Sequence, residues 1–211
     1  MRERSAALKR WQAGRLARTH ADFLDAPRYR AAARFFLDDL YGGHDFARRD
    51  AELARVIPTL SRMLPDSALA TLADAVELDA LTERLDEAVA DALGARLDKG
   101  VDEAQYARAY RRAGPRAERE HQLDLVLAIG RSLDRLVRHP LIGSILRAMG
   151  GPARMAGFSA MHAFLVRGFD AFSGIGGASE FLRRIDARER TILDRLSSGQ
   201  TADWTQVPGG C

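Results

Sequence analysis

The chain has 211 residues, of which 46% are hydrophobic and 29% are charged, so it is long enough to bury a core and predicts one domain. No apolar run approaches the roughly 20 residues that span a bilayer, and the first residues lack a signal-peptide core. The formal net charge is +3, and the single cysteine, Cys211, excludes an internal disulfide and a thiolate metal cluster. These features predict a cytoplasmic protein with no membrane partner.

The charged residues are unevenly distributed along the chain. All but two of the 32 basic residues are arginine, a composition typical of a GC-rich bacterium. Residues 1–34 carry 9 basic and 3 acidic side chains, whereas residues 35–100 carry 7 and 14. Complementary blocks of this kind neutralise one another on a folded surface, whereas nucleic-acid binders concentrate one sign on one face. We therefore do not expect nucleic-acid binding.

The second of the expected helices is the one around which the remaining chain is predicted to be organised. It follows an amphipathic helix over residues 5–24, and Asp25 is expected to cap it, with Pro27 in its first turn. Apolar side chains occupy two opposite sides of this second helix, which predicts an interior position. Gly42-Gly43 ends it, because glycine readily adopts the left-handed conformation of a helix C-terminus.

Two longer helices are expected next. The first covers residues 46–64, with Asp45 as its cap and Pro58 as the cause of a kink or a break. The second covers residues 67–97 and is predicted to be the longest helix of the chain. Gly100 ends it.

The middle of the chain contains two clear helix signatures. Asp102 and Gln105 resemble a capping box, which predicts a short helix ended by Gly114-Pro115. Residues 116–137 repeat apolar side chains at intervals of three and four, which predicts an amphipathic helix. His139-Pro140 breaks that helix.

Three further helical segments are expected in the last third of the chain. Residues 141–149 form a short apolar segment, and Gly150-Gly151-Pro152 separates it from an apolar stripe over residues 155–172. Ser179 is expected to cap the final helix, which ends near Leu196.

No run of alternating apolar and polar residues predicts a strand, so the fold class is all-α, a single-domain multi-helix bundle of about eight or nine helices. The helical domain is expected to span residues 1–197. Residues 198–211 lack periodicity and are predicted to form a flexible C-terminal tail, with the alternative that Trp204 docks back onto the domain.

His162 is the first candidate for a ligand-binding residue. It shares the apolar stripe of residues 155–172 and is predicted to point inward, as a histidine does in a haem pocket or a small-ligand pocket of a helical fold. The walls of such a pocket would be Met155, Phe158, Leu165 and Phe169. The alternative is a core histidine whose ring nitrogens bond a backbone carbonyl or a buried acid.

Glu118 and His121 form the spacing that ferritin-like di-iron bundles use to hold a metal ion. Such a site needs a second copy of the pair, which the sequence does not contain, so we predict no metal site. No serine stands in a nucleophile elbow, no phosphate-binding glycine motif is present, and Cys211 is a poor nucleophile on a flexible tail. The sequence thus indicates no catalytic residues and no cofactor.

Asp38 and Asp39 stand in the last turn of the second helix, where the helix dipole disfavours negative charge. Arg34, Arg48 and Arg49 are the nearby cations that could hold them. Adjacent residues point about 100° apart on a helix, so the two carboxylates are not expected to act on one substrate. An ion pair or a cap for the next segment is the predicted role.

The stretch that carries these two residues resembles the signature of uncharacterised bacterial proteins named for their FFLEELY motif. Asp38 and Asp39 replace the two glutamates of that signature. The resemblance extends over the helical body to about Leu196 and implies an all-helical bacterial protein, but it implies no activity. The motif residues here are Phe35, Phe36, Leu37, Asp38, Asp39, Leu40 and Tyr41, followed by Gly42-Gly43.

Two functional hypotheses follow from these patterns. The first is a non-catalytic cytosolic helical protein that binds another protein or a second copy of itself through an apolar helix face. The alternative is a ligand- or haem-binding sensor-type domain with its pocket near His162.

Overall fold

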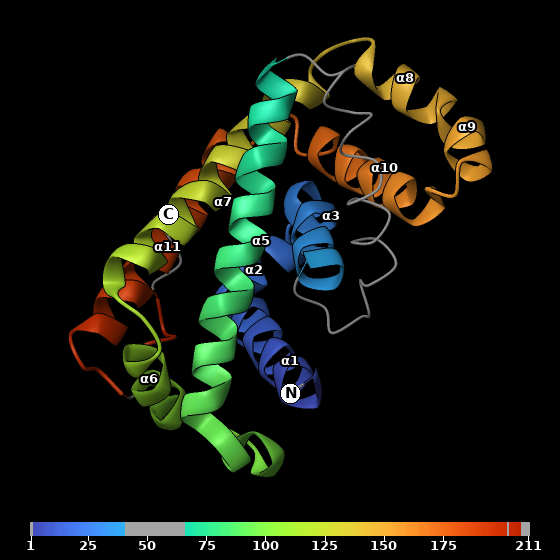
Figure 1. Cartoon of the computed structure of the whole chain (residues 1–211). Helices are drawn as coiled ribbons and strands as arrows, with labels where there is room; N and C mark the ends of the chain where they lie inside the picture. Colours follow the sequence, from blue (N-terminus) through green and yellow to red (C-terminus); the bar gives the residue numbers. More distant parts are fainter. Residues whose placement is uncertain (1, 41–65, 202, 208–211) are drawn as a thin grey trace.

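A computed structural model describes residues 2–40, 66–201 and 203–207 of the chain (Figure 1). These residues form ten α-helices and contain no strand, which confirms the predicted all-α class. The helices are α1 (Arg2–Thr19), α2 (Ala21–Asp25), α3 (Pro27–Phe35), α5 (Asp66–Leu93), α6 (Glu103–Arg112), α7 (Arg116–Val137), α8 (Ile142–Ala148), α9 (Gly150–Met155), α10 (Ser159–Ser173) and α11 (Ser179–Ser197). A π-helical turn (Phe36–Leu40) follows α3, and a 3₁₀ helix (Gly94–Lys99) follows α5.

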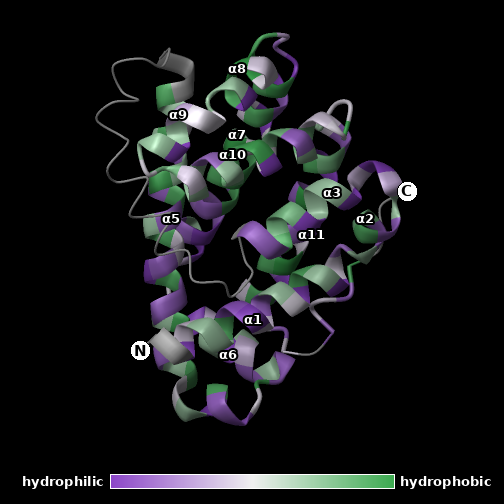
Figure 2. Ribbon diagram, turned by 90° about the vertical axis from the view of Figure 1, so that its right-hand side faces the viewer, coloured by the Kyte–Doolittle hydropathy of each residue, from purple (hydrophilic) through white to green (hydrophobic). Residues whose placement is uncertain are grey.

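The two longest of these helices, α5 and α7, lie side by side and form the centre of the bundle (Figure 1). Helix α11 packs along α7, and α1 and α6 pack against α5. Helix α3 contacts α10, while α8 and α9 pack on α10 at one end of the molecule. Hydrophilic and hydrophobic residues alternate along most helices, as expected for helices with one side in a core (Figure 2). None of the described helices is long and apolar enough to cross a membrane.

Helix α3 and the π-helical turn are buried on more than one side, as the two-sided apolar pattern predicts. Phe35 is buried, and its ring lies 5.3 Å from the ring of Phe164 in α10. The ring centroid of Phe36 lies 6.0 Å from that of Phe172 in α10 and 6.3 Å from that of Phe181 in α11. Gly168 makes the approach of Phe35 possible, since a Cβ atom there would lie 2.9 Å from the Phe35 ring. The aromatic segment therefore joins α10 to the central bundle.

Several predicted boundaries agree with the structure. Helix α7 has the predicted bounds, and α5 is the longest of the described helices, with Gly94 (φ 55°) marking its change to a 3₁₀ helix. The capping box at α6 is present: the Gln105 N–H donates to Asp102 Oδ1 (2.7 Å), and the Asp102 N–H donates to Gln105 Oε1 (3.3 Å). Local sequence signals were sufficient to predict these boundaries, because residues close by in the sequence supply the hydrogen-bond partners of the free backbone groups at the helix ends.

Other boundaries were predicted wrongly. The first helix ends at Thr19, and Asp25 belongs to the short helix α2, so Ala26 is the N-cap of α3. Gly150-Gly151-Pro152 does not separate two helices but opens α9, because proline is tolerated in a first helical turn.

The start of α11 also differs from the prediction. Ser179 is the first residue of the helix, and its predecessor Ala178 is the N-cap without a side-chain bond. Instead, the Ala178 N–H donates to Asp134 Oδ1 of α7 (2.8 Å). A residue 44 positions away thus replaces the local cap that the sequence suggests.

Trp204 lies in the segment that was predicted to be a flexible tail, and its side chain is fully buried. Its indole N–H donates to the carbonyl of Glu103 (3.1 Å), and its ring stacks on Tyr106 at 5.6 Å. The alternative, that Trp204 docks back, is therefore what the structure shows for residues 203–207. The predicted end of the second helix at Gly42-Gly43 and the predicted helix over residues 46–64, with Asp45 and Pro58, lie outside the described residues.

Candidate ligand cavity

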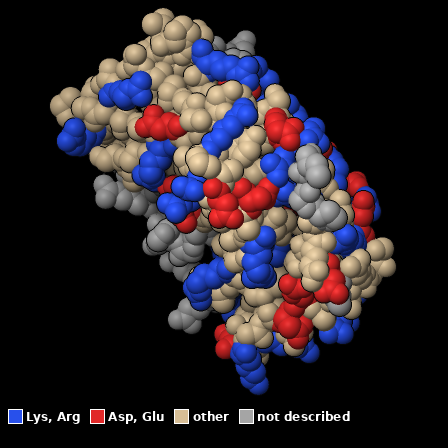
Figure 3. Space-filling model, turned by 180° about the vertical axis from the view of Figure 1, so that it is seen from behind, with Lys and Arg blue, Asp and Glu red and all other residues tan. Residues whose placement is uncertain are grey.

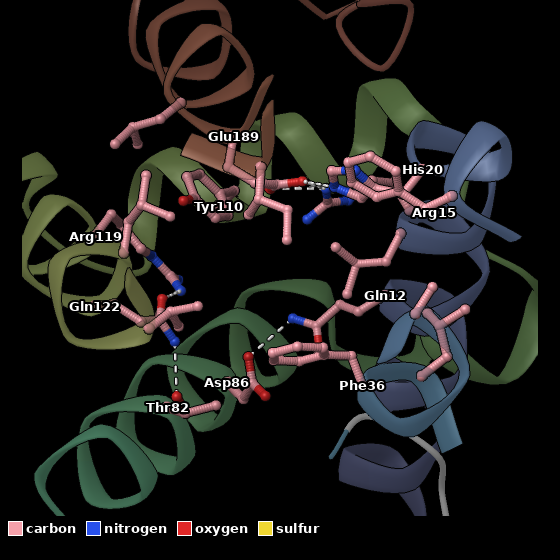
Figure 4. A pocket seen from close by; sticks show the side chains of 18 of the residues that line it. Gln12, Arg15, His20, Phe36, Thr82, Asp86, Tyr110, Arg119, Gln122 and Glu189 are labelled. Atoms are coloured by element: carbon pink, nitrogen blue, oxygen red, sulfur yellow. Dashed lines mark hydrogen bonds and ion pairs between the residues drawn. The ribbon is translucent and has the colours of Figure 1, made fainter. Parts of the chain in front are cut away.

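A partly enclosed cavity of about 170 Å³ lies at the centre of the bundle (Figure 4). Helices α1, α5, α7 and α11 contribute most of its polar side chains. Helices α2 and α3 and the π-helical turn contribute apolar side chains. Segments that are far apart in the sequence therefore converge on one space, and the fold of the bundle creates it.

Glu189 forms a buried ion-pair cluster at one side of the cavity. Arg15 Nη1 donates to both carboxylate oxygens of Glu189, at 2.7 and 2.9 Å, and His20 Nε2 lies 2.9 Å from Oε1 (Figure 4). Burial alone would raise the pKa of Glu189, but Arg15 and His20 outweigh it and lower the pKa to about 2. Glu189 is therefore ionised, and its charge is already matched by its neighbours.

Asp86 is a second buried acid, on the opposite side of the cavity. Gln12 Nε2 donates to Asp86 Oδ1 (2.8 Å) and lies 3.4 Å from the hydroxyl of Tyr106. Burial raises the pKa of Asp86 above its ordinary value, and the bond from Gln12 opposes the shift only in part. Gln12 Oε1 is buried and has no hydrogen-bond partner among the described residues. This side of the cavity thus contains an acid with a weakened tendency to ionise and a free amide oxygen.

Among the charged residues of the cavity, Arg119 has the charge that its neighbours compensate least, although only 5% of the residue is exposed. Its guanidinium lies 4.2 Å above the ring of Tyr110. Its two hydrogen bonds are long and go to neutral oxygens: 3.4 Å to Gln122 Oε1 and 3.5 Å to the Leu85 carbonyl. Arg119 Nε has no hydrogen-bond partner, and within the described part of the chain Arg119 forms no ion pair. A buried guanidinium without a carboxylate is costly, so this group is suited to an anion.

Figure 4 shows how these groups face one another. The guanidinium of Arg119 and the amide of Gln12 extend toward the open centre from opposite sides, and the cluster of Glu189 lies above them. Gln122 Nε2 is held by Thr82, to which it donates at 2.8 Å. The polar groups therefore converge on one space from different helices, in an arrangement that can orient a bound molecule.

Two residues of the motif segment line the same cavity. Phe36 and Leu37 belong to the π-helical turn and contribute to the apolar wall. Turns with this wider hydrogen-bond pattern are rare and occur often at functional sites. The motif segment is thus part of the cavity as well as part of the core.

The remaining motif residues have other roles. Asp39 accepts a bond from Arg167 Nε of α10 (2.9 Å), a partner that the sequence analysis did not include. Asp38 is exposed. Leu40 ends the π-helical turn, and Tyr41 lies outside the described residues together with Arg48 and Arg49.

The structure does not bring together the pocket that was expected near His162. His162 Nε2 donates to the carbonyl of Leu146 (2.8 Å), which is the structural alternative considered for this histidine. Met155 is 86% exposed on α9 and Leu165 is 45% exposed on α10, so neither is the wall of an enclosed space. Phe158 is partly buried.

Phe169 has a packing role of its own in this region. It is partly buried, and its ring lies 2.9 Å from the position that a Cβ atom of Gly143 would occupy. The predicted stripe therefore packs α8 and α9 onto α10.

Glu118 and His121 likewise contact different partners. Arg84 Nη1 donates to Glu118 Oε2 (2.8 Å), and His121 Nε2 lies 2.6 Å from Glu77 Oε1. The described residues contain no group of three or more side chains that could hold a metal ion.

The polar residues of the cavity were not among the predicted site residues, although the sequence carries a signal for them. Arg119 stands four residues before Leu123 of the apolar stripe of α7, Gln12 stands four residues after Leu8, and Glu189 stands four residues after Ile185. Each therefore continues the buried side of its helix. A polar residue at such a position is a candidate for an internal site, because buried polar groups are rare.

Comparisons with known proteins identify a family but no activity. A family model described as a domain of unknown function, DUF8198, matches residues 1–203. No curated protein and no solved structure matches the chain.

Proposed function

We propose that this chain, which belongs to the DUF8198 family, binds a small organic anion in its central cavity. The observation that carries the proposal is the buried guanidinium of Arg119, which borders the cavity and has no carboxylate partner in the described part of the chain. This replaces the pocket that was expected near His162 with one formed by other residues.

The charges around the cavity favour an anion over a cation or a neutral molecule. The charge of Glu189 is paired with Arg15, and His20 contacts the same carboxylate, so Glu189 is not available to a cation. Burial raises the pKa of Asp86, and the bond from Gln12 and the charge of Arg119 oppose the shift only in part, so this acid competes for the guanidinium less well than an ordinary carboxylate. Arg119 remains as a cation with donors to spare, and a guanidinium binds a carboxylate through two parallel hydrogen bonds.

The size of the cavity limits the ligand to about one ring. An engineered cavity of about 150 Å³ in another protein core accepts benzene, and the cavity here is of similar volume, about 170 Å³. Phe36 and Leu37 offer an apolar wall for such a ring. A monocyclic carboxylate satisfies both the apolar wall and Arg119, and benzoate is the simplest probe of that class.

Calorimetric titration with benzoate tests the proposal, with benzyl alcohol as a neutral ligand of the same shape. We expect benzoate to bind and to raise the melting temperature, because a ligand that binds the folded state stabilises it. We expect benzyl alcohol to bind at least about tenfold more weakly, since it lacks the charge that Arg119 pairs with. Equal binding of both ligands, or binding of neither, would contradict the proposal.

The variant R119Q tests whether benzoate binds at Arg119 or at arginines on the protein surface. It retains a polar side chain but removes the cation, and we expect benzoate binding to fall by about tenfold or more. R131Q is the matched control, because Arg131 is exposed on the same helix. Circular dichroism establishes that both variants are folded, and unchanged binding by folded R119Q would exclude Arg119 as the anion site.

The remaining expectations from the sequence stay predictions. A cytosolic location and a bacterial origin are supported by the single cysteine and by the dominance of arginine over lysine. The resemblance to the FFLEELY-motif proteins is supported by residues 35–43. Interaction with a protein partner or a second copy can be tested by light scattering at several protein concentrations, together with a pull-down.

A further inference from the structure

The exposed apolar residues of the molecule are concentrated in one region. Of the six large hydrophobic residues that are markedly exposed among the described residues, five lie between residues 141 and 165. They are Leu141, Ile145, Met149, Met155 and Leu165, and Val76 on α5 is the sixth. Exposed apolar residues are common singly, but a group of them on one element indicates a contact surface.

The orientation of α8 is set by its packing on α10. Gly143 is buried against the ring of Phe169, and the Leu146 carbonyl accepts the bond from His162. Leu141 and Ile145 are four residues apart and lie on the opposite side of the helix, with 60% and 53% exposure. The apolar side chains therefore point outward because the other side of α8 is occupied.

The chain segment that carries these residues contains no acidic residue, although acids of other segments lie beside it. Residues 135–169 contain five arginines and no aspartate or glutamate. Three of these arginines pair with acids of flanking or neighbouring segments: Arg138 with Asp134, Arg147 with Asp170, and Arg167 with Asp39. Arg135 donates to the Ser132 hydroxyl, and Arg154 is exposed on α9.

The surface view agrees with this distribution. The region of α8 to α10 is at the upper left of Figure 3, where much of the surface is uncharged and carries several basic groups with an acidic group among them, whereas acidic and basic groups are closely intermixed over the lower half. We define the α8–α9 face as Leu141, Ile145, Arg147, Met149, Arg154 and Met155.

We propose that the α8–α9 face docks on an anionic lipid surface. Exposed apolar side chains of such a face can reach the acyl boundary of a bilayer, while exposed arginines beside them contact anionic headgroups. Contact of this kind needs no membrane-spanning segment, so it agrees with the lengths of the described helices but revises the expectation of no membrane partner. It is independent of the ligand in the central cavity.

The charge of the face disfavours a second copy of the chain as its occupant. A symmetric dimer places the same patch of each subunit against the other, which would bring Arg154 of both copies into one interface. Like charges at an interface oppose association. An anionic bilayer provides both the apolar depth and the opposite charge.

Sedimentation with vesicles tests the proposal on the full chain. We expect the protein to pellet with phosphatidylcholine vesicles that contain about 30% phosphatidylserine, and at least about tenfold less with phosphatidylcholine alone. Added salt should weaken the binding, because it screens the attraction of exposed charges. The proposal is overturned if the protein pellets with neither vesicle or equally with both.

Matched variants locate the contact. I145E places a charge in the apolar part of the face and should reduce vesicle binding by about tenfold or more, whereas V76E, on α5, should leave it unchanged. R154E should reduce binding by about fivefold or more, and R112E on α6 is its control.

The results of these experiments distinguish a lipid surface from a second copy of the chain as the partner of the α8–α9 face. Equal effects of the face variants and their controls would place the contact elsewhere and overturn the proposal. A concentration-dependent dimer that I145E abolishes, without vesicle binding by the unaltered chain, would overturn it in favour of a self-interface.

Discussion

The central cavity and the α8–α9 face depart from ordinary packing in opposite ways. The cavity has charged side chains in the interior, including Arg119 and Glu189, whereas the face has Leu141, Ile145 and Met155 at the surface. A buried polar group and an exposed apolar group are the two departures that carry information about function. The buried charges make the cavity a candidate site for a small molecule, whereas the exposed apolar residues make the face a candidate contact with a larger surface.

The largest expected effect concerns the buried ion pairs, which have no equivalent on the face. Replacing Glu189 by alanine leaves Arg15 and His20 without their acid inside the bundle. We expect the free energy of unfolding to fall by about 3 to 5 kcal/mol, as for other broken buried pairs. Urea denaturation at pH 7 measures the change, and a loss below about 1 kcal/mol would mean that the cluster is solvated.

The second prediction concerns the close contact of the motif segment with α10. In G168A the new Cβ atom would lie 2.9 Å from the ring of Phe35, so Phe35 must shift, and we expect a loss of about 1 to 3 kcal/mol. Gly151 on α9 is the matched control, because a Cβ atom there meets nothing within 4 Å. G151A should be neutral or slightly stabilising through helix propensity. Equal stability of the two variants in thermal unfolding would contradict the described contact.

The third prediction uses the opposite pKa shifts of the two cavity acids. The pKa of Glu189 is lowered to about 2 from 4.5, so its stabilising contribution is present above about pH 4.5 and is lost as the pH falls toward 2. The raised pKa of Asp86 has the opposite sign, because the folded state binds that proton more tightly and stability is lost as the pH rises.

The variant D86N tests the sign of the Asp86 shift. It removes the ionisation of the buried acid, so we expect it to be more stable than the unaltered chain at pH 7, and this advantage should shrink on acidification. Urea denaturation over a series of pH values measures both effects. A variant that is less stable at pH 7, with a deficit that disappears on acidification, would show that Asp86 contributes through its ionised form.

The smallest expected effect concerns an exposed ion pair near the face. Arg147 and Asp170 are both about 60% exposed, at 60% and 59%, and their atoms are 3.5 Å apart. D170N should change the free energy of unfolding by no more than about 0.5 kcal/mol. It should also strengthen binding to anionic vesicles, because it frees Arg147. Weaker vesicle binding would contradict the assigned role of Arg147.

The parts of the fold that could be predicted from the sequence are those that depend on local signals. The bounds of α7 follow from its apolar repeat between Pro115 and His139-Pro140, and the start of α6 follows from the capping box of Asp102 and Gln105. The interior position of Phe35 follows from a helix that is apolar on two sides. These features need no knowledge of distant segments.

The parts that could not be predicted depend on contacts between distant residues. The cap of α11 comes from Asp134, and the partner of Asp39 is Arg167, 128 positions away. The cavity requires side chains from α1, α5, α7 and α11 to meet, and no local pattern defines that meeting. His162 was chosen as a site residue because it is a polar residue in an apolar stripe, and the same criterion applied to Arg119 and Glu189 points to the cavity.

A crystal structure of the protein soaked with 4-bromobenzoate tests the central claim most directly. We predict an anomalous bromine peak inside the cavity, near Phe36 and Leu37, with the carboxylate within hydrogen-bond distance of Arg119. Ordered water filling the cavity, with no bromine peak at this site, would contradict the claim and assign the unpartnered atoms of Arg119 and Gln12 to hydration.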